Sequence, residues 1–260
     1  MKRNLLDFLI VGAAKCGTTS LYNYLSKHEQ IFLPESKEPK YFTSKILDFP
    51  MGGKGDELTE ELMIKNYSEY YSLFESKTSE QICGEASVDY LFYAKEIAPM
   101  IMEKLGDIKI IIMLRNPAIR AFSAYKHLVR DVRETQTFEN ALLLEEQRKK
   151  ENYEFIWYYK TAGLYYKNVK IFNEIFTNVK IIPFDNLVDK PNDTIIDLLE
   201  FLNVSKDFIP EVSKVYNKTG MPRNEFLQTL LKGSPEQRSR KFLRYIMPKK
   251  MRSFVREKME

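Results

Sequence analysis

The chain has 260 residues and a formal net charge of +4, with 44% apolar and 29% charged residues, a composition typical of a soluble globular protein. No stretch approaches the ~20 consecutive apolar residues that a membrane-spanning helix requires. Two cysteines, Cys16 and Cys83, are too few for a disulfide framework or a zinc site. The length predicts one substantial domain over residues 1–260.

Strand and helix patterns alternate along the chain. The first apolar run, residues 6–11, predicts a buried strand, and residues 46–62, with three glycines, predict an irregular surface excursion. Further strands are expected at 30–33, 82–85, 108–114 and 179–184, and helices at 67–74, 93–105, 118–129, 138–150, 164–176 and 192–202. This alternation favours an α/β fold: a single three-layer domain with a central parallel sheet flanked by helices.

A glycine loop joins the first strand to the first predicted helix. It reads Gly12-Ala13-Ala14-Lys15-Cys16-Gly17-Thr18-Thr19. A buried strand, a tight loop and a helix start present backbone N–H groups to an anion. The spacing is similar to a nucleotide P-loop, but Thr18 stands where that motif has its lysine, and Lys15 lies two residues before Gly17 instead. The loop therefore predicts an anion site that differs from that of a typical NTPase.

Three segments resemble motifs of the sulfotransferases that use 3′-phosphoadenosine 5′-phosphosulfate (PAPS). Residues 15–21, KCGTTSL, are similar to the 5′-phosphosulfate loop, and residues 110–123, IIIMLRNPAIRAFS, to the 3′-phosphate motif. Residues 37–42, KEPKYF, resemble the K-E-x-x-F-F segment of the heparan-sulfate-type and related bacterial members. The resemblance runs from about residue 7 to residue 223. It implies a P-loop NTPase-like sulfotransferase fold and PAPS as the sulfuryl donor, with no metal.

The resemblance also implies which residues hold the nucleotide. The 5′-phosphosulfate would lie against the loop, and Arg115 with Ser123 would bind the 3′-phosphate. A late basic loop supplies two further candidates, Lys218 and Arg223. Arg115 closes a predicted strand, and ligands of open α/β sheets bind at the carboxyl ends of strands. The predicted loop contacts are Lys15, Cys16, Gly17, Thr18, Thr19 and Ser20.

Catalysis requires charge neutralisation on the leaving phosphate and a base for the acceptor. Lys15 is the predicted cation at the leaving oxygen. The general base of the heparan-sulfate-type members maps onto Glu38, and Glu85 in Gly84-Glu85-Ala86 is the second candidate. Lys40, with Lys37, can steady the sulfuryl oxygens or an acidic acceptor.

Three basic residues outside these roles are interpreted as structural. Arg120 lies in the helix that follows Arg115, and neither His28 nor His127 lies in a motif that matches the catalytic histidine of cytosolic small-molecule sulfotransferases. The chain is thus expected to work without a histidine base.

The C-terminal tail, about residues 232–260, carries ten Lys or Arg and three Glu among apolar residues. It is expected to be helical, either packed on the domain or lying on an anionic membrane or glycan. Nucleic acid is a poor fit, since no binding module is present. The N-terminus leads directly into the first strand, which leaves no room for a signal peptide and predicts a cytoplasmic protein.

The sequence therefore predicts a sulfotransferase that transfers a sulfuryl group in line from PAPS to a hydroxyl, or to an amine, of a carbohydrate or glycoconjugate. Two alternatives are a P-loop nucleotide kinase or NTPase, and a binding protein that keeps the nucleotide pocket without catalysis. No motif specifies the sugar, the position modified or the oligomeric state.

Overall fold

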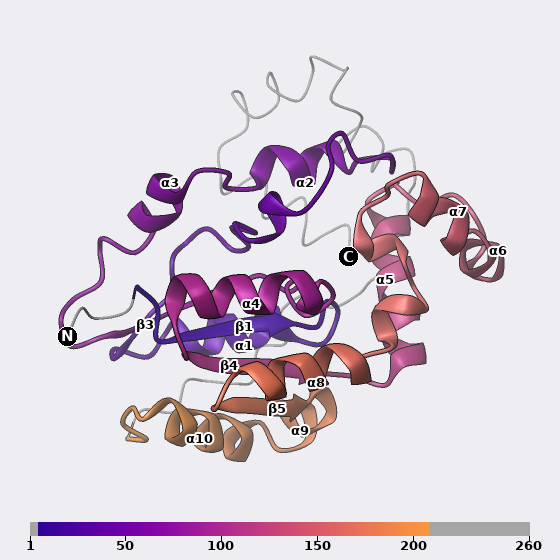
Figure 1. Cartoon of the computed structure of the whole chain (residues 1–260). Helices are drawn as coiled ribbons and strands as arrows, with labels where there is room; N and C mark the ends of the chain where they lie inside the picture. Colours follow the sequence, from indigo (N-terminus) through magenta and orange to yellow (C-terminus); the bar gives the residue numbers. More distant parts are fainter. Residues whose placement is uncertain (1–4, 208–260) are drawn as a thin grey trace, which may run out of the picture.

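A computed structural model describes residues 5–207 of the chain. Its centre is one sheet of five strands in the order β2-β3-β1-β4-β5, and every neighbouring pair is parallel (Figure 1). The strands are β1 (Phe8–Gly12), β2 (Ile31–Phe32), β3 (Ile82–Ala86), β4 (Lys109–Leu114) and β5 (Val179–Pro183). All five predicted strands are present, so the expected parallel sheet is confirmed.

Helices cover both faces of this sheet. The long helices beside it are α1 (Thr18–Leu25), α4 (Ala94–Leu105), α8 (Tyr166–Ile175) and α10 (Pro191–Leu202). α4 and α8 contact each other on one face. The connections through α4 and α8 lead toward the β5 edge of the sheet, whereas the connection from β1 through α1 leads toward the β2 edge. Because such connections are right-handed, α1 lies on the other face, behind β1 in Figure 1. The three-layer α/β prediction is confirmed.

The central strands are apolar because they are buried on both faces. Every residue of β1 is buried, and the side chains from Ile110 to Met113 in β4 are fully inaccessible. Gly84 in β3 has a packing reason: a Cβ there would lie 2.2 Å from the Phe8 ring. The sheet is thus a rigid platform for the loops at the carboxyl ends of β1 and β4.

A second hydrophobic cluster lies beside the sheet core. It joins α5 (Pro117–Arg130) to the aromatic run 155–159 and to Ala14 and Val88. The helix expected at 138–150 is two helices, α6 (Phe138–Leu143) and α7 (Glu145–Lys150). At the break, the buried Glu145 carboxylate accepts hydrogen bonds from the amides of Lys160 and Thr161, at 2.6 and 2.9 Å.

Residues 46–62 are more ordered than the glycine content predicted. They end in α2 (Glu57–Leu62), and α3 (Tyr67–Ser72) follows. Asp56 is completely buried and accepts hydrogen bonds from the Trp157 indole N–H (2.9 Å) and the Glu154 amide (2.8 Å). A buried carboxylate with these partners fixes the segment to the second cluster. Residues 46–56 form neither helix nor strand, as expected, and the expected excursion differs in ending in the helix α2.

Two shorter features complete the described part. A helix not predicted from the sequence, α9 (Phe184–Asp189), follows β5 directly, and short 3₁₀ turns occupy residues 43–45, 155–157 and 161–163. Within residues 5–207, no helix has the length and apolar character needed to cross a membrane. Residues 1–4 and 208–260 lie outside the described part, and with them the predicted contacts Lys218 and Arg223 and the basic tail.

Candidate active site

The loop after β1 has the geometry of an anion cradle. Gly17 (φ 85°) precedes α1 in a left-handed conformation, and Lys15 (φ 68°) adopts a similar one. Left-handed backbone is costly for a residue with a Cβ, and it concentrates at functional sites. A Cβ on Gly17 would also lie 2.9 Å from the Phe184 ring. Both the turn and the close approach therefore require glycine here.

Within residues 5–207 the loop leaves several donors without protein partners. Two of its amides are used, that of Ala13 by the Met113 carbonyl in β4 (2.8 Å) and that of Cys16 by the Ala13 carbonyl inside the loop (3.2 Å). Among residues 5–207, no hydrogen bond is formed by the amides of Lys15, Gly17 or Thr18. With the positive end of the α1 dipole, these amides form a site suited to phosphate or sulfate oxygens.

Two cations stand beside the loop without carboxylate partners in the described part of the chain, Lys15 and Arg115. Arg115 donates weakly to the Lys15 carbonyl (Nη1 to O, 3.4 Å), and its guanidinium lies 4.1 Å from the Phe184 ring centroid. Burial, with a contribution from Arg130, lowers the pKa of Lys15 to about 8. An anion bound here would restore the lysine charge, because an opposite charge favours the ammonium form.

A cleft of about 520 Å³ opens over this loop. Most of the predicted side chains meet on its wall. The cleft is lined by Lys15, Gly17, Thr18, Thr19, Ser20, Glu38, Lys40, Arg115 and Ser123, together with Thr59, His127, Arg133, Glu154, Phe184 and neighbouring apolar residues. Ligand sites usually have this size and position in open α/β folds.

The Cys16 side chain is not brought to the cleft. Its sulfur is fully buried and lies 3.7 Å from both the Ala14 carbonyl and the Tyr165 hydroxyl. Burial raises the pKa of the thiol to about 11, so the group stays neutral. Since its amide is also used within the loop, the residue packs the loop onto the core, and a contact of Cys16 with the nucleotide stays a prediction.

Glu38 faces the cleft as an ionised carboxylate. Its Oε1 pairs with the Lys37 ammonium at 2.9 Å, and its Oε2 accepts a long hydrogen bond from the Val88 amide (3.5 Å). Burial raises the pKa of Glu38, but Lys37 and Lys40 outweigh it, so the pKa is lowered overall. The carboxylate is therefore deprotonated at neutral pH, which is the state a general base needs.

Glu85, the second candidate base, is not on the cleft wall. Its carboxylate is completely inaccessible and accepts hydrogen bonds from the hydroxyls of Tyr70 (2.7 Å) and Ser87. The Ser87 hydroxyl oxygen in turn accepts from the Lys40 amide at 2.9 Å. Glu85 therefore supports the segment that carries Glu38 and Lys40 but does not contact the cleft.

Sequence reasoning did not identify a buried ionic network at the far end of the cleft. The Lys40 ammonium bonds Glu154 at 3.2 Å and lies 3.9 Å from Asp89. Arg133 bonds the other Glu154 oxygen (3.0 Å) and also Asp56. The five residues of this network come from five separate stretches of chain, so no local spacing indicates them. The only hint was a lone Glu154 before a run of aromatic residues.

The two histidines differ in position. The His28 ring bonds the Ser205 carbonyl (2.9 Å), as expected of a structural residue. His127 lines the cleft, where it bonds Arg130 (2.8 Å). Burial and the nearby Lys15 lower the pKa of His127 to about 4, so its ring is neutral. The spacing of four from Ser123 places both on one face of α5, and this signal was available in the sequence.

Arg120 is structural, as predicted, since it is fully buried and donates to the Tyr159 carbonyl. Among residues 5–207, no group of three or more His, Cys, Asp or Glu side chains has a metal-binding arrangement. The nucleotide contacts and the metal-free mechanism remain predictions.

Comparisons with known proteins identify the family of the chain. A model of the sulfotransferase family matches residues 7–208, most of the chain. The chain belongs to the sulfotransferase family. A crystal structure of a sulfotransferase from Alicyclobacillus acidocaldarius superposes on it with a TM-score of 0.78, at 43% identity over 82% of this chain and 86% of that one. The family and fold decide against the kinase alternative.

Two curated relatives of this sulfotransferase align over less than half of it. A membrane-associated sulfotransferase, kil1, of Dictyostelium discoideum is 31% identical over 46% of this chain. Carbohydrate sulfotransferase 15 of Mus musculus is 28% identical over 47%. The alignments span 22% and 27% of those proteins. The match supports sulfuryl transfer as the chemistry and leaves the acceptor to be proposed.

Proposed function

We propose that this sulfotransferase moves a sulfuryl group from PAPS to a hydroxyl, or less readily an amine, of a carbohydrate or glycoconjugate. The observation that carries the proposal is the cleft. We call the group of lining residues with the open loop amides and the cations that lack carboxylate partners within residues 5–207 the nucleotide end, and the group with the ionised Glu38 carboxylate the acceptor end. A relative named as a carbohydrate sulfotransferase supports the acceptor class.

The nucleotide end fits a doubly phosphorylated nucleotide. The open amides of the loop, the hydroxyls of Thr18, Thr19 and Ser20, and the Lys15 ammonium would hold the 5′-phosphosulfate. Arg115 and Ser123 lie on the same cleft wall and would hold the 3′-phosphate. No acidic side chain pairs with Lys15 or Arg115 among residues 5–207, so both positive charges remain for these anions.

Bound PAPS supplies the sulfuryl group and leaves as 3′-phosphoadenosine 5′-phosphate. Glu38 takes the proton from the acceptor hydroxyl as the new O–S bond forms, and Lys15 with the loop amides stabilises the negative charge on the phosphate oxygen as the old S–O bond breaks. Preorganised donors of this kind are typically worth a few kcal/mol each. Lys40, which is held by Glu154, would steady the sulfuryl oxygens with its charge.

The first test is calorimetric titration with 3′-phosphoadenosine 5′-phosphate, without metal, against ATP with magnesium. We expect the 3′-phosphorylated nucleotide alone to bind tightly, and Lys15→Ala to weaken it at least tenfold. Lys95→Ala, an exposed lysine on α4, is the matched control. Binding of magnesium-ATP only would contradict the proposal, and nucleotide binding without transfer to any acceptor would favour the binding-protein alternative.

A further inference from the structure

One polar side chain of the cleft wall, that of His127, takes no part in the proposed reaction. It lies one turn after Ser123 on α5, and residues four apart on a helix share one face. The His127 side chain is 28% exposed, and its Nε2 forms no hydrogen bond within residues 5–207. The ring therefore has a nitrogen to offer to a ligand in the cleft.

The other ring nitrogen of His127 is held by the end of the same helix. Its Nδ1 lies 2.8 Å from Nη2 of Arg130, and because arginine carries only donors, Nδ1 must accept. The Asp131 carboxylate lies 3.7 Å from Nδ1, which is too far for a hydrogen bond, and it accepts from Nε of Arg130 at 3.3 Å instead. An imidazole whose Nδ1 accepts is neutral and carries its proton on Nε2.

The charges around the ring favour the same neutral form. Burial, followed by the charge of Lys15, lowers the pKa of His127 to about 4. Arg130 and Arg133 add to this effect, and Asp131 opposes it. At neutral pH the ring therefore adds no charge to the cleft and presents a single N–H donor.

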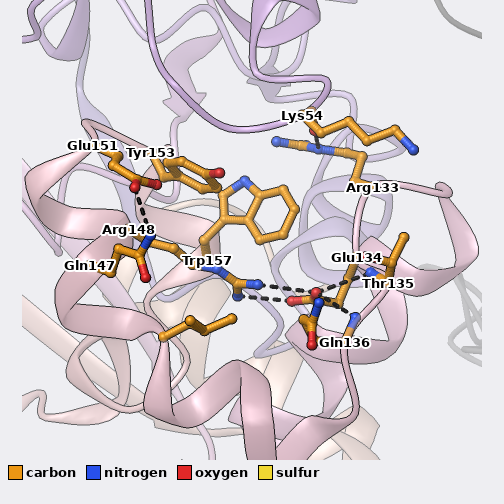
Figure 2. A pocket seen from close by; sticks show the side chains of 11 residues that line it. Lys54, Arg133, Glu134, Thr135, Gln136, Gln147, Arg148, Glu151, Tyr153 and Trp157 are labelled. Atoms are coloured by element: carbon orange, nitrogen blue, oxygen red, sulfur yellow. Dashed lines mark hydrogen bonds and ion pairs between the residues drawn. The ribbon is translucent and has the colours of Figure 1, made fainter.

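His127 is close to both ends of the cleft. Lys15 belongs to the nucleotide end and Arg133 to the acceptor end, and the charge of each acts on the ring. Arg133 is fixed: it bonds Glu154 at 3.0 Å, and Figure 2 shows it beside the Trp157 indole, with 5.5 Å from the guanidinium carbon to the ring centroid. In an in-line transfer, the group that moves lies between the leaving oxygen and the acceptor. A donor near both ends would therefore meet the oxygens of the sulfuryl group.

We propose that His127 donates its Nε2–H to a sulfuryl oxygen of bound PAPS, and that Arg130 is the positioning residue that holds the ring in this tautomer. The inference rests on the proposed function and adds to it a contact that distinguishes PAPS from the product nucleotide. Because Nε2 carries the proton, the ring orients the sulfuryl group and does not act as a base. Because the ring is neutral, it also does not repel the Lys15 ammonium.

The first test compares calorimetric titrations with PAPS and with 3′-phosphoadenosine 5′-phosphate, which lacks the sulfuryl group. His127→Leu removes the donor and should weaken PAPS binding about fivefold to tenfold, the size of one neutral hydrogen bond. Affinity for the product nucleotide should stay unchanged. His127→Gln should restore most of the PAPS affinity, because its amide N–H has a similar reach. Lys126→Leu, on the same helix but outside the cleft wall, is the matched control and should bind both nucleotides as the wild type does.

Two results of this titration would overturn the inference. One is an unchanged PAPS affinity in His127→Leu, and the other is an equal loss for both nucleotides, which would indicate a structural role or a contact with the nucleotide itself. A wild-type protein that binds neither nucleotide would contradict the proposed function and the inference with it, so the two failures give different results.

The second test observes the ring directly, by nitrogen NMR of the protein with isotope-labelled histidine. The chain has only two histidines, His28 and His127, so each ring can be followed. At neutral pH we expect His127 to be protonated on Nε2 alone. Arg130→Met should shift the ring toward the form protonated on Nδ1, because Asp131 can then accept from it, and the His28 ring is the internal control. A wild-type ring protonated on Nδ1, or one that Arg130→Met leaves unchanged, would overturn the role of Arg130.

Discussion

The nucleotide end of the cleft takes its groups from short contiguous stretches, whereas the acceptor end assembles them from distant ones. The loop supplies its donors within residues 15–20, and β4 with α5 supplies Arg115 and Ser123. At the acceptor end, Lys40, Arg133, Asp56 and Glu154 come from separate segments. The two ends also differ in how their cations are neutralised. Among residues 5–207, the cations of the nucleotide end have no carboxylate partners, whereas the cations of the acceptor end form ion pairs.

This difference indicates two kinds of task. In the proposed function, the cations without carboxylate partners at the nucleotide end would keep their charge for the phosphates, whose binding would supply the missing partner. The paired cations at the acceptor end hold side chains in place, so that Glu38 and Lys40 would present a fixed geometry to the acceptor. The following changes break one end while leaving the other intact.

The largest effect is expected from Glu38→Gln. Removing the base should lower the transfer rate by roughly 10²–10⁴-fold with little change in nucleotide affinity, because Glu38 belongs to the acceptor end. Steady-state transfer and calorimetry measure the two quantities. Glu35→Gln, exposed on the same segment, is the control and should keep the wild-type rate. An active Glu38→Gln variant would remove Glu38 from the mechanism.

Lys15→Ala should lower the transfer rate by about 10²–10³-fold and weaken nucleotide binding as well. Because the pKa of Lys15 is about 8, the free wild-type site loses its charge as the pH rises through that value. Affinity for 3′-phosphoadenosine 5′-phosphate should therefore fall between pH 7 and 9.5 in the wild type and change less in the variant. Calorimetry at three pH values checks this, and parallel pH profiles would contradict the assignment.

Arg133→Met should destabilise the fold by about 3 kcal/mol, since it leaves the buried Asp56 carboxylate without its cation and Glu154 paired with Lys40 alone among residues 5–207. Chemical denaturation measures the change. The control is Lys180→Met, which breaks a half-exposed pair with Asp197 and should cost less than about 1 kcal/mol. Similar costs for both would show that the acceptor-end network is not specially important to stability.

Glu85→Gln should alter the dependence of stability on pH. Burial raises the pKa of Glu85 from 4.5 to about 7, so between these values the folded chain binds a proton that the unfolded chain has lost. Stability contributed by this group therefore falls as the pH rises through that window. The wild type should lose about 2 kcal/mol relative to the variant between pH 5 and pH 8. Urea denaturation at both pH values measures the difference, and a constant difference would show that Glu85 is ionised throughout.

The sequence by itself determined the parallel sheet, the glycine loop and the position of Arg115 at a strand end. These features depend on the periodicity of apolar residues and on residues that are contiguous in the sequence. Both can be read from the sequence because backbone geometry determines which neighbouring residues share a face of a helix or strand. The placement of Ser123 and His127 on one side of α5 also follows from the sequence, because a helix places residues four apart on one face.

Only the tertiary structure showed that Glu38 lines the cleft whereas Glu85 is buried away from it, turned Cys16 into the core, and brought Arg133 and Glu154 to the cleft. A carboxylate can act as a base only where the acceptor reaches it, and burial depends on how distant segments pack. Contacts between residues far apart in the sequence leave no local pattern. The ion pair of Arg133 with Asp56 joins residues 77 positions apart, and the hydrogen bond from the Glu154 amide to the Asp56 carboxylate joins residues 98 positions apart. Their energy arises from the low-dielectric environment that the completed fold creates.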